Sequence, residues 1–253
     1  MYLIGDIGNT DIKICIFNAN LKLIKQVRFK TVLSNKDYLE KNLRFIKKHK
    51  LDIKKVLFSS VVPIIYKVIK KIIEKLIKIK CTELKQLSLD KLVKIKVNKK
   101  QIGSDRLANA ISVINKKNNF IVVDFGTATN FDVIIKNNYI GGILAPGVNL
   151  SLKTLFDNAS LIPKIKLEKT KRIIGKNTTS AIRAGFYHGY SGLIDNIIKM
   201  IIKQTGKSFN IILTGGYSYL FKNSIKKKTI VKKNLTINGV LKAAVFLSKW
   251  KKN

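Results

Sequence analysis

The chain contains few of the residues on which several common classes of protein depend. Its two cysteines, Cys15 and Cys81, are too few for a disulfide framework and lack the spacing of metal ligands. Uncharged apolar runs stay well short of the roughly 18 residues of a membrane span. The chain opens in a strand-like segment, without the charged region and cleavage site of a signal peptide. We therefore expect a globular protein of the reducing cytoplasm, with no membrane partner.

Acidic residues are also scarce. The chain has 14 Asp and Glu against 50 Lys and Arg, which gives a formal net charge of +36. Five of the basic residues are arginines, and the 45 lysines are scattered over the whole chain. Proteins that read nucleic acids favour arginine, whose planar fork binds bases and phosphates. We interpret the charge as a solvated surface with only non-specific affinity for polyanions; steering of an anionic substrate such as ATP is a compatible alternative.

The Walker and Rossmann nucleotide-binding loops are absent as well. In their place, two similar stretches occur 118 positions apart, Asp6-Ile7-Gly8-Asn9-Thr10 and Asp124-Phe125-Gly126-Thr127-Ala128-Thr129. Each follows a short apolar run and precedes an alternating one, which predicts a strand, a tight turn and a second strand with an Asp at the tip. Glycine amides and small hydroxyl groups suit a phosphate, and a neighbouring carboxylate suits a cation. The alternative for either copy is a plain hairpin turn.

The remaining pattern predicts two similar halves. Three strands followed by alternating helices and strands is the order of a ribonuclease-H-like unit, and it occurs twice. We expect an α/β fold of two such half-domains with mixed sheets flanked by helices, residues 1–117 and 118–253, facing each other across a nucleotide. The predicted strands are 2–5, 13–17, 23–29, 55–59, 120–123, 131–135, 139–144 and 210–213. The predicted helices are 36–48, 63–78, 151–158, 178–204 and 239–250.

A further motif, Gly103-Ser104-Asp105-Arg106, opens the amphipathic segment 107–114. It has a structural explanation, because Ser and Asp at the start of a helix cap its amide groups and complement its dipole. It also has a chemical one, since a carboxylate beside an arginine near a helix N-terminus stays ionised and accepts a proton from an alcohol. The local sequence leaves both explanations open.

Other segments carry weaker signals. Gly141–Gly147 indicates the end of a strand and a rigid turn, and Asn177–Ser180 has the composition of a helix cap. Thr214–Gly216 follows an apolar strand and suits either a loop or a close approach to an adenine or ribose. His49 and His188 have no metal-ligand spacing, and we interpret His188 as a packed residue.

Together, these motifs resemble those of the type III pantothenate kinases, members of the acetate and sugar kinase, Hsp70 and actin superfamily. The second Asp loop and the Gly-x-Asp-Arg element are specific in combination. The resemblance implies ATP-dependent phosphorylation of pantothenate to 4'-phosphopantothenate, the first step of coenzyme A biosynthesis, by a homodimer with its pantothenate site near the subunit interface. The matching segments are 6–10, 59–63, 103–106, 124–132, 142–147, 175–178, 214–216 and 235–246.

The resemblance also implies a role for each matching residue. Asp105 would be the general base that receives the hydroxyl proton. Asp6 would place Mg²⁺, and Asp124 would bind a monovalent cation, K⁺ or NH₄⁺. The implied ATP and phosphate contacts are Asp6, Gly8, Asn9, Thr10, Lys13 and Thr127. The implied pantothenate contacts are Gly103, Ser104, Arg106 and Thr178.

Two departures from the family pattern leave alternatives open. The family usually carries a tyrosine and an Asn-Pro pair before the Gly-x-Asp-Arg element, where this chain has Lys96-Val97-Asn98-Lys99. Asn130 stands where a threonine is common. The lost tyrosine leaves open a kinase of another small alcohol, and the basic surface leaves open a non-catalytic accessory or regulatory relative that binds polyanions.

Overall fold

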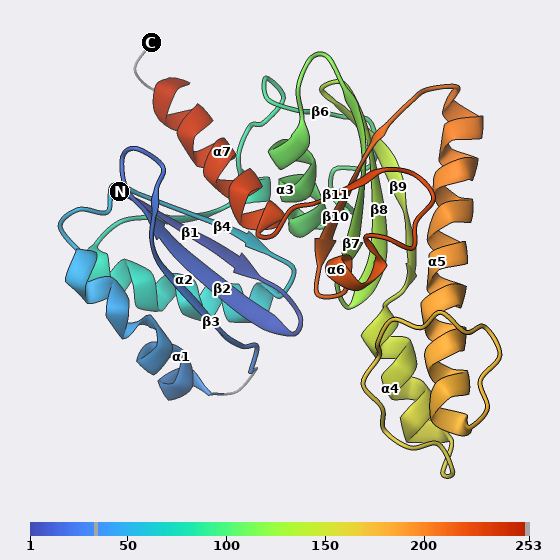
Figure 1. Ribbon diagram of the computed structural model, residues 1–253. Helices are drawn as coiled ribbons and strands as arrows, with labels where there is room; N and C mark the ends of the chain where they lie inside the picture. The colour runs from blue at the N-terminus through green and yellow to red at the C-terminus, as the bar shows by residue number, and fades with distance from the viewer. Residues whose placement is uncertain (33–34, 251–253) are drawn as a thin grey trace. The chain divides into compact units, whose positions relative to one another are not determined.

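The computed structural model describes residues 1–32 and 35–250, which form two compact units (Figure 1). The first unit comprises residues 1–113 together with the segment from residue 235 onward, and the second comprises residues 114–234. The sequence-based division left the C-terminal helix in the second half. In the structure this helix, α7 (Leu235–Trp250), belongs to the first unit because it packs on α3 (Ser104–Val113) and on the adjoining sheet.

A five-stranded sheet in the order β3-β2-β1-β4-β5 forms the centre of the first unit. Its first three strands are an antiparallel meander, whereas β4 runs parallel to β1 and β5 runs parallel to β4. One face carries Leu3, Ile7, Ile14 and Phe58 into the core. The strands are β1 (Tyr2–Ile7), β2 (Asp11–Phe17), β3 (Leu23–Lys30), β4 (Lys55–Ser60) and β5 (Cys81–Glu83).

Helices α1 (Lys36–Leu43) and α2 (Pro63–Ile77) pack on that face, with the 3₁₀-helix η1 (Arg44–His49) after α1. Isoleucines three or four positions apart form the buried stripe of α2, which is the spacing of one helix face. Pro63 suits the first turn, where no amide hydrogen is needed, and Lys78 ends the helix with φ of 59°. A short 3₁₀-helix η2 (Leu84–Gln86) and strand β6 (Lys94–Ile95) follow β5.

The second unit repeats the arrangement, with strands in the order β11-β10-β7-β8-β9. Its meander is again antiparallel, and β10 and β11 again run parallel to the first strand. The strands are β7 (Asn119–Phe125), β8 (Ala128–Ile135), β9 (Asn138–Pro146), β10 (Asn210–Gly215) and β11 (Thr229–Val231). The helices are α4 (Val148–Asn158), α5 (Thr178–Thr205) and α6 (Ser218–Phe221).

The two units therefore place corresponding strands in corresponding positions, which confirms the predicted α/β fold of two mixed sheets flanked by helices. The sequence missed β5 and β11 because strands of three residues carry no periodic signal.

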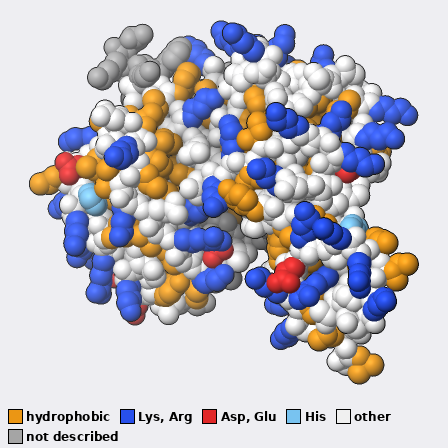
Figure 2. Space-filling view, viewed as in Figure 1, with side chains coloured by type: hydrophobic (Ala, Val, Ile, Leu, Met, Phe, Trp, Pro, Cys, Tyr) orange, Lys and Arg blue, Asp and Glu red, His pale blue; other side chains and the backbone are white. Residues whose placement is uncertain are grey.

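Within the part of the chain that the structure describes, every helix is too short or too polar to cross a membrane. Lys and Arg side chains are spread over the visible face rather than gathered in one patch (Figure 2).

The close packing of α7 on α3 depends on Gly239, because a Cβ atom there would overlap the carbonyl group of Ala108. We expect Gly239→Ala to lower the free energy of unfolding by about 1–3 kcal/mol through overpacking. The neighbouring Asn238 is exposed on the same helix, so Asn238→Ala should change stability by less than roughly 0.5 kcal/mol. Urea unfolding of the two variants checks this, and equal midpoints would contradict the packing argument.

Candidate active site

Polar residues gather at one edge of the first sheet. Because β1, β4 and β5 are parallel, their carboxyl ends meet at that edge, where Asp6 is in register with Ser59 and Glu83 is in register with the preceding residue, Phe58. The start of α3 lies at the same edge: the Val61 N–H donates to the Ile7 carbonyl at 3.0 Å, and Val61 also lies next to Gly103. This edge therefore collects the first Asp loop and the Gly-x-Asp-Arg element in one unit.

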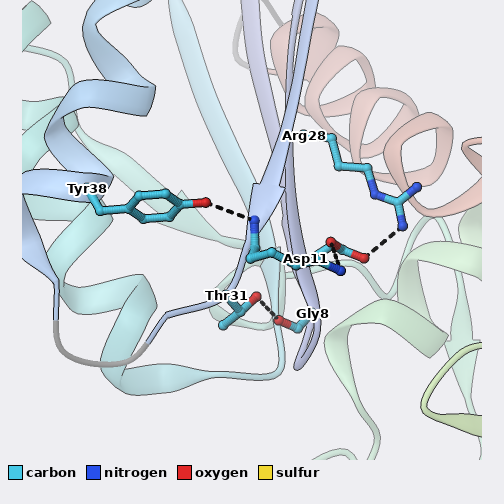
Figure 3. Close-up of polar contacts among 6 residues, drawn as sticks. Gly8, Asp11, Arg28, Thr31 and Tyr38 are labelled. Carbon is cyan, nitrogen blue, oxygen red and sulfur yellow. Dashed lines mark hydrogen bonds and ion pairs between the residues drawn. The ribbon is translucent and has the colours of Figure 1, made fainter.

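The loop between β1 and β2 is a braced turn. The Gly8 N–H donates to the Asp11 carbonyl at 3.1 Å, while the Thr31 hydroxyl donates to the Gly8 carbonyl at 2.7 Å (Figure 3). The backbone N–H of Thr31 also donates to the Thr10 carbonyl at 3.0 Å. Asn9 and Thr10 are exposed at the tip. The Gly8 amide thus closes the turn, and the exposed polar residues of the loop are Asn9 and Thr10.

Asp11 anchors the far side of this turn. Its carboxylate accepts from Arg28 at 2.7 Å and pairs with Lys30 at 3.3 Å (Figure 3). Burial alone would raise the pKa of Asp11, but the hydrogen bonds and charges of Arg28 and Lys30 hold that pKa below its ordinary value. This carboxylate is occupied by structural contacts.

The predicted position of the two loop aspartates at a turn tip is wrong. Asp6 and Asp124 are the penultimate residues of β1 and β7, because the strands extend one residue past each Asp before the chain turns. Asp6 is half-buried and pairs across the sheet with Lys13 of β2 and Ser59 of β4. The Ser59 hydroxyl is fully buried and has no hydrogen-bond partner among the described residues. Lys13 and Ser59 therefore occupy the positions on either side of Asp6 in the sheet.

Asp105 lies in the first turn of α3, as the sequence predicts. Its Oδ1 accepts from the Arg106 backbone N–H at 2.8 Å, and a Cβ at position 103 would collide with the same oxygen, so a larger residue there would displace the carboxylate. Burial raises the pKa of Asp105 above its ordinary value of 3.8, although the amide and charge of Arg106 act in the opposite direction. A half-buried carboxyl of raised pKa is a good proton acceptor near neutral pH.

Glu83 is a site residue that the sequence analysis missed. It ends β5, and its carboxylate accepts hydrogen bonds from the Ser104 hydroxyl and from the Lys85 backbone N–H. Ser104 is buried and uses its hydroxyl in this contact rather than to cap α3. The one sequence signal for Glu83 is the Gln three residues later, which completes a capping box at η2. That pattern marks a helix start and carries no hint of a contact 21 residues away.

The sheet of the second unit has a similar polar edge, but the residues beside its aspartate differ. Asp124 pairs across its sheet with Asn130 and Thr214, which occupy the positions that Lys13 and Ser59 hold in the first unit. The Asn130 side-chain oxygen is buried without a hydrogen-bond partner among the described residues. Gly215 has φ of 85° and lies so close that a Cβ would approach Asp124 Oδ1 to 2.7 Å. Asp124 thus has neutral oxygen groups where Asp6 has an ammonium group.

The two remaining predicted residues of the second unit lie in exposed segments. Thr127 stands in the turn between β7 and β8, and Gly147 packs so closely on it that a Cβ would overlap the Thr127 carbonyl. Thr178 begins α5 and is exposed. The segment before it is the predicted helix cap: the Asn177 side chain accepts from the Ser180 N–H at 2.9 Å, and the Ser180 hydroxyl accepts from the Asn177 N–H at 3.1 Å.

Neither unit offers a complete metal site from the protein alone. Among the described residues there is no group of three or more His, Cys, Asp or Glu able to hold a metal ion. Mg²⁺ in phosphoryl-transfer sites needs only one or two carboxylates, because substrate phosphates and water complete its shell. Asp6 beside the buried Ser59 hydroxyl fits that pattern, and the oxygens of Asp124 and Asn130 fit a hard cation of lower charge.

A family model and relatives similar in sequence agree on one family. The family model for "Type III pantothenate kinase" matches residues 2–200. A type III pantothenate kinase of Pelagibacter ubique (strain HTCC1062) is 57% identical over 98% of this chain and 100% of its own length. A type III pantothenate kinase of Sulfurihydrogenibium sp. (strain YO3AOP1) is 36% identical over 99% of this chain and 100% of its own length.

Solved structures with the same fold belong to proteins with more varied names. The ethanolamine utilization protein EutJ from Carboxydothermus hydrogenoformans matches with a TM-score of 0.54 at 15% identity, over 94% of this chain and 88% of its own. An activator of 2-hydroxyisocaproyl-CoA dehydratase from Clostridium difficile, solved with bound ADPNP, matches with a TM-score of 0.56 at 13% identity, over 100% and 97%. At these identities the likeness concerns the fold alone.

The opposite pKa directions of Asp105 and Asp11 predict opposite effects on stability. Folded Asp105 holds its proton more tightly than the unfolded chain does, so its contribution to stability falls as pH rises above about 3.8. Asp105→Asn should therefore stabilise the protein at neutral pH, with the gain vanishing below that value. Asp11→Asn should destabilise at neutral pH, and its loss should vanish in acid. Urea unfolding of both variants from pH 3 to 8 measures this; the same sign for both would contradict it.

Proposed function

The chain belongs to the type III pantothenate kinase family, so its reaction is ATP-dependent phosphorylation of pantothenate, the first step of coenzyme A biosynthesis, and we propose that Asp105 receives the proton of the substrate hydroxyl. As the proton moves to Asp105, the alcohol oxygen bonds to the γ-phosphorus of ATP and the bond to ADP breaks. The products are 4'-phosphopantothenate and ADP. Phosphoryl transfer asks mainly for positioning and charge stabilisation, which one base, a phosphate loop and bound cations supply.

The observation that carries this assignment is the environment of Asp105. Its carboxylate is half-buried at a helix start, where burial raises its pKa, and it is confined between Gly103 and the Arg106 amide. A base of raised pKa takes a proton from an alcohol more readily than an ordinary carboxylate does. Burial raises the pKa of Glu83 on this edge as well, but its carboxylate is already bonded to the Ser104 hydroxyl and the Lys85 amide, and Asp6 lies beside Lys13.

The ATP phosphates bind, in this proposal, at the first loop. The exposed tip of Asn9 and Thr10, braced through Gly8, offers polar groups to the phosphates, and Lys13 adds positive charge beside Asp6. Asp6 would hold Mg²⁺, with the neighbouring Ser59 hydroxyl available to a water of its shell. The ion, when bound, neutralises charge that develops on the phosphates.

A monovalent cation, K⁺ or NH₄⁺, is proposed at Asp124. The support is the contrast with Asp6: the position that Lys13 fills in the first unit is taken in the second by Asn130, whose buried oxygen accepts no other hydrogen bond among the described residues. One negative charge among neutral oxygens suits a single positive charge. Thr127, exposed on the adjoining turn, is proposed as an ATP contact.

Pantothenate is proposed to contact Gly103, Arg106 and Thr178. Ser104 would contribute indirectly, because its hydroxyl is buried and bonded to Glu83. The tyrosine usual in the family is absent, and a small, largely apolar pocket beside the start of α3 supports an alternative contact. This pocket is lined by Lys85, Leu87, Leu89, Asp90, Ile95, Lys99, Ile102 and Leu107.

The homodimer and the cytoplasmic setting expected from the sequence stay predictions. Light scattering of the purified protein tests whether it is a homodimer.

A kinase assay of Asp105→Asn tests the proposed base. The amide keeps the shape of the side chain but takes no proton, so we expect kcat for pantothenate to fall by about 100- to 10,000-fold. Asp37 also lies in the first turn of a helix but is exposed on α1, and Asp37→Asn should keep normal activity. Full activity of Asp105→Asn would remove the proposed base. Turnover of another small alcohol without turnover of pantothenate would overturn the substrate.

A titration with KCl tests the second site. We expect the rate of the native protein to rise with KCl and Asp124→Asn to lose most of that activation, because the amide supplies no negative charge. Asp157→Asn, at an exposed position of α4, serves as the control for a lost surface charge. An Asp124→Asn variant with the same half-activating KCl concentration as the native protein would contradict the assignment.

A further inference from the structure

The carboxylate of Glu83 joins the end of β5 to the start of α3, one residue before the proposed base. Its Oε1 accepts the hydrogen bond of the Ser104 hydroxyl, and its Oε2 accepts from the Lys85 N–H at 2.8 Å. Ser104 is 1% exposed and Glu83 is half-buried, so this contact is partly shielded from water. Hydrogen bonds to a carboxylate are the stronger kind, and water competes little with a shielded one.

Glu83 is itself held rigidly. Its own N–H donates to the Gln86 side chain at 3.2 Å, so the two residues cap η2 reciprocally. Its Cα lies in register with Phe58, a fully buried core residue of β4, and the Ser60 amide faces its carboxylate. The charged and titratable groups that act on or face this carboxylate are Lys85 on η2 and Tyr66 on α2. A fixed carboxylate is therefore presented to Ser104.

Asp105 depends on the orientation of that first helical turn. Its Oδ1 lies directly over Gly103, where a Cβ would collide with it, and accepts the Arg106 N–H at 2.8 Å. A small rotation of the turn would move the carboxylate off Gly103 and into water. Because a displacement of about 1 Å costs roughly 100-fold in rate at a reacting group, the anchor of this turn matters for the chemistry.

We propose that Glu83 is a positioning residue for phosphoryl transfer, which through Ser104 holds the first turn of α3 so that Asp105 stays over Gly103. The proposal rests on the proposed function, since it assumes that Asp105 receives the proton. Glu83 touches neither substrate nor the reacting atoms in this role.

The test compares Glu83→Ala, Glu83→Gln, Ser104→Ala and the double variant Glu83→Ala/Ser104→Ala in the pantothenate assay. Glu83→Ala should lower kcat by about 10- to 100-fold with KM for ATP unchanged, because only the base is displaced. Glu83→Gln should keep more activity, since its amide oxygen still accepts from Ser104. The double variant should be no slower than Glu83→Ala, because both changes break one contact. The acid limb of the pH profile should move to lower pH as Asp105 gains contact with water.

Glu74→Ala is the matched control. Glu74 accepts the Cys81 N–H at 2.8 Å at the other end of β5, so its loss should lower stability and leave kcat and the pH profile unchanged. Native kcat in Glu83→Ala, effects that multiply in the double variant, or an unmoved acid limb would overturn the proposal. If Glu83→Ala does not fold, native kcat and pH profile in Ser104→Ala, which removes the donor of the same contact, would overturn it equally. Asp105→Asn separates the two claims: full activity there defeats the proposed base itself, whereas native Glu83→Ala beside inactive Asp105→Asn defeats only the anchor.

Discussion

The burial of the Asp105 carboxylate at the first turn of α3 is the constraint on which the account depends. Burial disfavours the charged form and raises the pKa of this carboxyl. The hydrogen bond from the Arg106 amide stabilises the charged form and limits that rise. Glycine at position 103 makes room for the side chain, and Ser104 fixes the turn against Glu83. Burying this carboxyl costs stability, and its proposed role as the base would explain why the protein tolerates that cost.

The repeated topology explains how one kind of strand end serves two purposes. In each unit the first strand carries an Asp one residue before its end, and parallel pairing sets a hydroxyl residue beside it, Ser59 or Thr214. The antiparallel neighbour differs, since Lys13 stands beside Asp6 and Asn130 beside Asp124. A carboxylate beside a lysine would suit phosphates and a shared Mg²⁺, whereas one beside a neutral amide would suit a cation of its own. The exchange of Lys13 in the first copy for Asn130 in the second accounts for their separate proposed roles.

The sequence predicted most elements because their periodicity is strong. Helix 178–204 was predicted almost to the residue, since Asn177 and Gly206 mark both ends of α5. The start of α7 was placed four residues late, because its first turn lacks an acidic residue and Asn234 gives a weak signal. The membership of α7 in the first unit depends on the contact of Gly239 with Ala108, which no local pattern records. The sequence analysis missed Glu83 for the same reason, because only the tertiary fold brings its partner Ser104 close to it.

The central claim is that Asp105 is a carboxyl of raised pKa that can receive the hydroxyl proton. A ¹³C NMR titration of the side-chain carboxyl carbons, with the Asp105 signal identified by its absence in Asp105→Asn, measures that pKa directly. The account predicts a midpoint clearly above the ordinary value of 3.8. A midpoint at or below 3.8 would contradict it.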